Sequence, residues 1–99
     1  MTAAELIGRW ERIAAHPVAL NDDDWLNDLD VRQLLHDLSR KERAPYRERL
    51  RAADAAFKAA TLPVRTCLWG EANARRHGWT RRRNWWYYRI PAAGLPAER

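Results

Sequence analysis

Apolar residues recur at helical spacing at the start of the chain. Steps of four and three residues place one stripe on a single helical face: Leu6, Trp10 and Ile13. Thr2 and Glu5 precede the stripe with the spacing of a capping box, in which each side chain accepts a hydrogen bond from the other residue's backbone amide. Pro17 disfavours helical angles at the residue before it. We therefore predict a helix over residues 3–15.

An acidic stretch and a second apolar stripe follow. Asn21 precedes three aspartates, a pattern typical of a cap and first helical turn, where carboxylates meet the positive end of the helix dipole. This predicts a short helix or turn over residues 22–28 that carries Trp25 into the core. Asp30 then resembles a second cap, which predicts a separate helix over residues 31–39.

The clearest helical stripe lies in the middle of the chain, at steps of four, three, four and three: Tyr46, Leu50, Ala53, Phe57 and Ala60. Pro45 suits a first helical turn because its missing N–H has no partner there. We predict a helix over residues 45–60.

The three stripes together predict a hydrophobic core made of eleven side chains: Leu6, Trp10, Ile13, Val31, Leu34, Leu35, Leu38, Tyr46, Leu50, Ala53 and Phe57. Five arginines are expected largely outside it: Arg9, Arg12, Arg32, Arg47 and Arg51.

The remaining residues, 64–91, allow three interpretations. Strand-forming residues in 64–69 and 85–90 favour a hairpin or extended arm, which we rank first. The second is a short helix from Glu71 to His77 that Gly78 ends, with Thr80 capping another helix. The third is an irregular segment folded over the helices.

These elements predict a mainly α fold. It is a small single-domain three-helix bundle over residues 1–91, with a C-terminal basic-aromatic arm (residues 64–91) or short β-hairpin packed on it. Residues 92–99 are expected to form a frayed tail. At 99 residues, two separate cores would each be too small to be stable.

Composition narrows the class of protein. The chain is 46% hydrophobic and 31% charged, which is typical of a soluble globular protein. Its one cysteine, Cys67, excludes an internal disulfide and a zinc site built from cysteines. No apolar segment is long enough for a membrane span, so we expect a cytoplasmic protein without a membrane partner. The formal net charge of +5 is concentrated in the second half of the chain.

The run from Trp79 to Pro91 combines four arginines and five aromatic residues within thirteen positions. Arginines can follow a nucleic-acid backbone while aromatic faces stack on bases. The candidate binding residues in and just before this run are Arg75, Arg76, Trp79, Arg81, Arg82, Arg83, Trp85, Trp86, Tyr87 and Arg89. They predict a small non-enzymatic protein that contacts nucleic acid.

Two other interpretations of the run are open. Trp, Tyr and Arg are also enriched at protein-binding hot spots, which favours an acidic protein partner and an inhibitor, antitoxin, immunity protein or subunit of a larger assembly. The aromatic residues could instead close the core of a small domain. Three scattered histidines, His16, His36 and His77, predict no catalytic site, metal or cofactor.

Overall fold

The computed structural model of this protein describes residues 1–94. Within that range the chain is mainly helical and carries a short two-stranded antiparallel sheet. Four of its α-helices are longer than four residues, so the predicted count of three helices is wrong. The additional helix lies in the C-terminal part of the chain, where a hairpin was ranked first.

Helix α1 spans Ala3–Ala15, as predicted from its apolar stripe. Its capping box is formed: the Thr2 hydroxyl accepts a hydrogen bond from the Glu5 amide at 3.1 Å, and the Glu5 carboxylate accepts one from the Thr2 amide at 3.0 Å. These two bonds satisfy backbone donors that have no partner inside the helix.

Helix α2 is continuous over Asp22–Asp37, so the predicted break at Asp30 is wrong. Asn21 caps the helix and accepts a hydrogen bond from the Asp24 amide at 2.9 Å. The Asp30 carboxylate does not cap a second helix, because it accepts hydrogen bonds from the Tyr87 hydroxyl at 2.7 Å and from Trp69 Nε1 at 3.2 Å.

The continuous helix also changes which face of α2 is buried. Trp25, Leu29 and Arg32 follow one another at steps of four and three, and all three side chains are buried. Leu34 therefore points away from the core and is 50% exposed, contrary to its predicted core position. Arg32 was expected outside the core, but it lies on the buried stripe and is only 8% exposed.

A short helix and a 3₁₀ turn lead into the helix predicted over residues 45–60. Helix α3 covers Arg40–Arg43, the 3₁₀ turn η1 covers Ala44–Tyr46 with Pro45 in its first turn, and helix α4 covers Arg47–Ala59. Phe57 of α4 is fully buried, which confirms the predicted apolar face.

The segment after α4 departs from the predicted hairpin. Strand β1 (Thr61–Pro63) pairs with strand β2 (Arg89–Pro91). β1 therefore lies before the expected 64–69 segment, whereas Arg89 and Ile90 of β2 lie within the expected 85–90 segment. Helix α5 covers Glu71–His77 and ends at Gly78, whose φ of 70° is left-handed, which confirms that part of the second interpretation.

The aromatic residues before β2 form the 3₁₀ turn η2, Trp85–Tyr88. Trp86, Tyr87 and Tyr88 are buried in succession. A strand sends neighbouring side chains to opposite faces, so a flat strand would not bury all three against one core.

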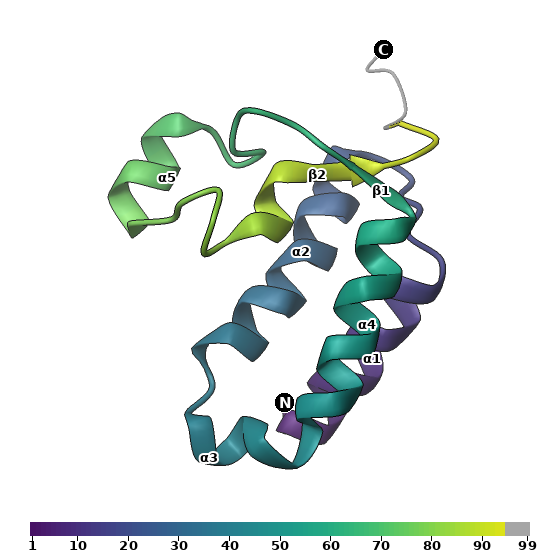
Figure 1. The fold of residues 1–99 in the computed structure, drawn as a ribbon. Helices are drawn as coiled ribbons and strands as arrows, with labels where there is room; N and C mark the ends of the chain where they lie inside the picture. The colour runs from purple at the N-terminus through teal and green to yellow at the C-terminus, as the bar shows by residue number, and fades with distance from the viewer. Residues whose placement is uncertain (95–99) are drawn as a thin grey trace.

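Figure 1 shows how these elements are arranged: α1 and α4 lie side by side, α2 crosses beside them, and α5 projects from the bundle. Phe57 packs against two tryptophans at the centre of the core. Its ring centroid lies 4.7 Å from that of Trp10 and 5.6 Å from that of Trp25. The predicted frayed tail covers residues 92–99, of which residues 95–99 lie outside the described part. At its start, the Ala92 amide donates a hydrogen bond to the Ala60 carbonyl at 3.1 Å.

Candidate nucleic-acid interface

The aromatic residues of the Trp79–Pro91 run lie mostly inside the protein. Trp86 and Tyr87 are each only 1% exposed. Tyr87 donates its hydroxyl to Asp30, and desolvation, followed by that hydrogen bond, raises the pKa of the phenol. The faces of these two rings therefore pack against the core and are closed to a partner.

Two aromatic residues of the run are half-buried. Trp85 packs against Phe57, with ring centroids 6.0 Å apart, and its ring lies 4.4 Å from the Lys58 ammonium. Trp79 lies between two rings: its centroid is 4.4 Å from that of His77 and 4.4 Å from that of Tyr87. Both tryptophans thus border the surface while packing on the core.

The arginines of the C-terminal part differ in their exposure to solvent. Arg89 is half-buried, and its guanidinium donates to the Thr61 hydroxyl at 2.7 Å and to the Thr61 carbonyl at 2.9 Å. Desolvation lowers the pKa of Arg89. Its guanidinium also donates to the Lys58 carbonyl in the last turn of α4 at 3.1 Å, so Arg89 joins β2 to β1 and to the end of α4.

Five predicted binding arginines are exposed: Arg75, Arg76, Arg81, Arg82 and Arg83. Arg83 donates to the Gly78 carbonyl at 2.8 Å, and its amide donates to the Thr80 hydroxyl at 3.1 Å. Thr80 therefore caps a turn over residues 81–83 and not a further helix. The structure places this arginine cluster at the surface but separates it from the buried aromatic rings.

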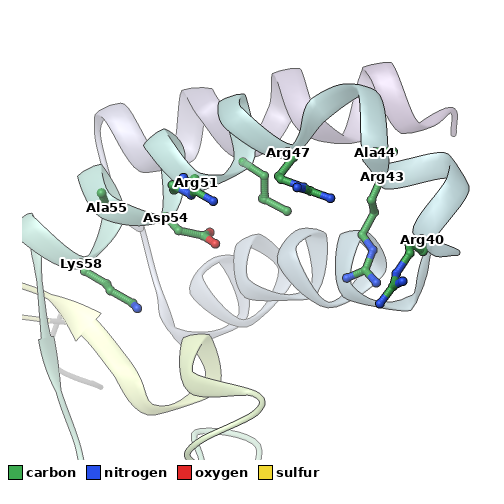
Figure 2. A pocket seen from close by; sticks show the side chains of 9 residues that line it. Arg40, Arg43, Ala44, Arg47, Arg51, Asp54, Ala55 and Lys58 are labelled. Atoms are coloured by element: carbon green, nitrogen blue, oxygen red, sulfur yellow. The ribbon is translucent and has the colours of Figure 1, made fainter.

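A groove of about 580 Å³ lies along α3 and α4, and cationic side chains make up much of its lining. We call it the basic groove. Figure 2 shows arginine side chains of α3, and arginine and lysine side chains of α4, extending into the same hollow. Its cationic lining residues are Arg40, Arg43, Arg47, Arg51 and Lys58.

Helical spacing brings these cations together. Arg43, Arg47 and Arg51 follow one another at steps of four residues, and Lys58 comes seven residues later. This spacing places the three cations of α4 on one face of that helix, where four residues correspond to an axial rise of about 6 Å. Arg40 and Arg43 come from α3, which the 3₁₀ turn η1 separates from α4. The groove therefore presents a row of positive charges along one side of the α3–α4 segment.

The carboxylate in the groove is already paired. Asp54 Oδ1 accepts hydrogen bonds from Trp10 Nε1 and Arg32 Nε, each at 2.9 Å, and Oδ2 accepts one from Arg32 Nη2 at 3.0 Å. Because Arg32 is buried, it depends on Asp54 for charge compensation. Asp54 consequently neutralises Arg32 and not the five cations of the groove.

One further ion pair lies at the groove in the described part of the chain, and it is weak. Arg51 lies 3.6 Å from the Glu48 carboxylate, and both side chains are exposed to solvent. Among residues 1–94, Arg40, Arg43 and Arg47 make no salt bridge. Exposed pairs of this kind stabilise little and are screened by salt, so an anionic ligand can displace the one that is present.

The basic groove was not among the sequence-predicted sites. We expected Arg47 and Arg51 outside the core without assigning them a role, and Arg40, Arg43 and Lys58 were not considered. The signal was present in the sequence as a cationic stripe at steps of three, four, four and seven. It could have been found by testing charged residues, as well as apolar ones, for helical periodicity.

In the described part of the chain, no helix has the length and apolar character needed to cross a membrane. Nor does any group of three or more His, Cys, Asp or Glu side chains in that part converge to hold a metal ion. The chain matches no protein-family model, and searches of curated proteins and of solved structures give no significant match.

Proposed function

We propose that this protein is a non-enzymatic nucleic-acid-binding protein and that the basic groove contacts the phosphate backbone. The observation that carries the proposal is the lining of one groove by five cationic side chains. Among residues 1–94 the one acidic side chain in that lining is Asp54, which is held by Arg32 and Trp10. Arginine suits this role because its planar guanidinium can donate two parallel hydrogen bonds to a phosphate.

The charge distribution along the chain supports the same function. Residues 45–99 contain twelve Lys/Arg and four Asp/Glu, whereas residues 1–44 contain six and nine. A positive surface attracts a polyanion over a distance of about one Debye length, roughly 8–10 Å at physiological salt. The exposed Arg81, Arg82 and Arg83 add a second basic patch next to the half-buried Trp79.

The test is a titration of labelled single-stranded RNA or DNA with the protein, at several salt concentrations. A groove variant, Arg43→Ala/Arg47→Ala/Arg51→Ala, is compared with a control variant, Arg9→Ala/Arg12→Ala/Arg65→Ala, which removes three exposed arginines that do not line the groove. The two variants have the same net charge, so any difference between them reports the position of the charges.

We expect the groove variant to bind much more weakly than the control. Its plot of log K against log salt should also be shallower by about 2, because each lost contact to a single strand removes about 0.7 from the slope. Equal losses in the two variants would mean that net charge alone drives binding. If the wild-type protein retains no nucleic acid even at low salt, the proposal fails, and an acidic protein becomes the ligand to test.

A further inference from the structure

A second hollow, of about 340 Å³, lies between the last turns of α2 and the segment that follows α5. We call it the α2–α5 cleft. One wall is formed by Gln33, His36 and Asp37, and the other includes His77, Trp79 and Arg83. Asn84 Nδ2 donates to Gln33 Oε1 at 3.0 Å, which joins the two walls at its base.

The cleft adjoins the basic groove. Asp37 lines the cleft and Arg40 lines the groove. They are three positions apart in the sequence, so their Cα atoms are at most about 11 Å apart. His36 is near cations of both hollows. Burial, followed by the charge of Arg32, lowers its pKa; Asp37 opposes this shift, and Arg43 and Arg83 lower the pKa further. A single extended ligand can therefore reach both sites.

The outer wall of the cleft is flat and aromatic. The rings of His77 and Trp79 are stacked, with centroids 4.4 Å apart and planes 19° apart, and Trp79 packs in turn on Tyr87. His77 is exposed, whereas Tyr87 is buried in the core. The core thus supports a stack of three rings, and the outermost ring is accessible to a planar ligand.

The polar groups of the cleft include acceptors as well as donors. The Asp37 carboxylate accepts a hydrogen bond from Gln33 Nε2 at 3.0 Å and keeps further acceptor sites. A carboxylate repels a phosphate but accepts hydrogen bonds from the amino groups of a nucleobase. This separates the cleft from the basic groove, whose lining is dominated by cations.

We propose that the α2–α5 cleft accepts one unpaired nucleobase of a strand whose phosphates lie in the basic groove, so that the protein prefers single-stranded to double-stranded nucleic acid. The inference rests on the proposed nucleic-acid binding and adds a base-recognising subsite to it. A paired base presents neither its face nor its pairing edge to such a cleft, whereas a base in a single strand can be unstacked and inserted.

The test compares two single strands that carry the same number of phosphates, one with bases and one built entirely from abasic sites. Wild-type protein should bind the base-bearing strand about fivefold to tenfold more tightly, as expected for one stacked base. His77→Ala should reduce this preference to less than about twofold. His77→Phe keeps a flat ring at the same position and should retain the preference.

The outcomes separate the two proposals. Equal binding of the two strands by wild-type protein, or an equal loss on both strands in His77→Ala, would overturn the base subsite while leaving the groove intact. A duplex bound as tightly as the single strand would also overturn it. If neither strand binds, or if the groove variant binds both as well as wild type, the proposed function itself fails. Circular dichroism of each variant checks that α5 and the bundle remain folded.

Discussion

The segment Arg40–Lys58 and the segment Trp79–Pro91 are both rich in arginine, but they use it differently. The first segment is almost entirely helical and lines one groove with five of its seven cations. The second packs Trp86 and Tyr87 into the core and uses Arg89 to join β2 to the end of α4. A dense run of arginine and aromatic residues therefore does not by itself identify a binding surface.

The difference has a physical cause. A small protein buries a limited share of its surface, so large aromatic side chains are needed to complete its core. The α1 and α4 stripes supply few large residues besides Trp10 and Phe57, and α4 is rich in alanine. The aromatic run provides the missing volume, whereas charges at helical spacing on α4 have no such role and stay in solvent.

The largest expected effect tests the structural role of the aromatic run. Trp86→Ala should lower the free energy of unfolding by about 3–5 kcal/mol, because it leaves a large cavity in the core. Trp86→Phe should cost much less, since the buried Trp86 Nε1 makes no hydrogen bond within residues 1–94. Urea unfolding followed by circular dichroism measures both. A loss below about 1 kcal/mol in Trp86→Ala would show that the run is not part of the core.

A somewhat smaller loss of stability is expected when the Arg32–Asp54 ion pair beneath the basic groove is broken. Asp54→Asn removes the charge that compensates buried Arg32, and breaking a buried pair in this way costs about 3 kcal/mol. Chemical unfolding should therefore show a clear loss. The matched control is Glu11→Gln, which breaks the exposed Arg49–Glu11 pair and should change stability little. Similar effects in the two variants would mean that Arg32 is solvated and that Asp54 remains available to the groove.

The smallest expected effect on stability concerns His36, which lines the α2–α5 cleft. Burial and then the nearby charges lower the pKa of His36 in the folded state, so the unfolded state binds more protons as the pH falls below about 6.5. The His36 contribution to stability is therefore present above that pH and lost as the pH falls toward the folded pKa. Unfolding curves between pH 7.5 and pH 5 should show a modest decrease that His36→Gln reduces. An unchanged decrease in that variant would assign the pH dependence to other groups.

Several features of the fold could be predicted because their signals act within a few residues. The capping box of Thr2 and Glu5 and the stripe of Leu6 and Trp10 placed α1 correctly. The prediction that Asp30 caps a second helix was wrong. The Asp30 carboxylate instead accepts hydrogen bonds from Trp69 and Tyr87, which are 39 and 57 residues away. A capping residue is recognised from its neighbours, but its actual partners depend on the whole fold.

The basic groove, too, could be predicted only in part from the sequence. The spacing of Arg47, Arg51 and Lys58 can be read from the sequence, and it is sufficient to place them on one face of α4. The pairing of Asp54 with Arg32 and Trp10 cannot, because it joins residues 22 and 44 positions apart. That pairing decides whether the groove is neutralised, so the chemical character of the groove depends on tertiary contacts.

Local sequence patterns were sufficient to predict the helical class of the protein, the cap and bounds of α1, and the buried face of α4. Each follows from hydrogen bonds and side-chain spacing within one or two helical turns. The packing of distant segments was needed to establish that Trp86 and Tyr87 complete the core, that Arg32 is buried, and that the groove lies near the α2–α5 cleft. Burial and charge pairing depend on which distant segments pack together, and no local pattern contains that information.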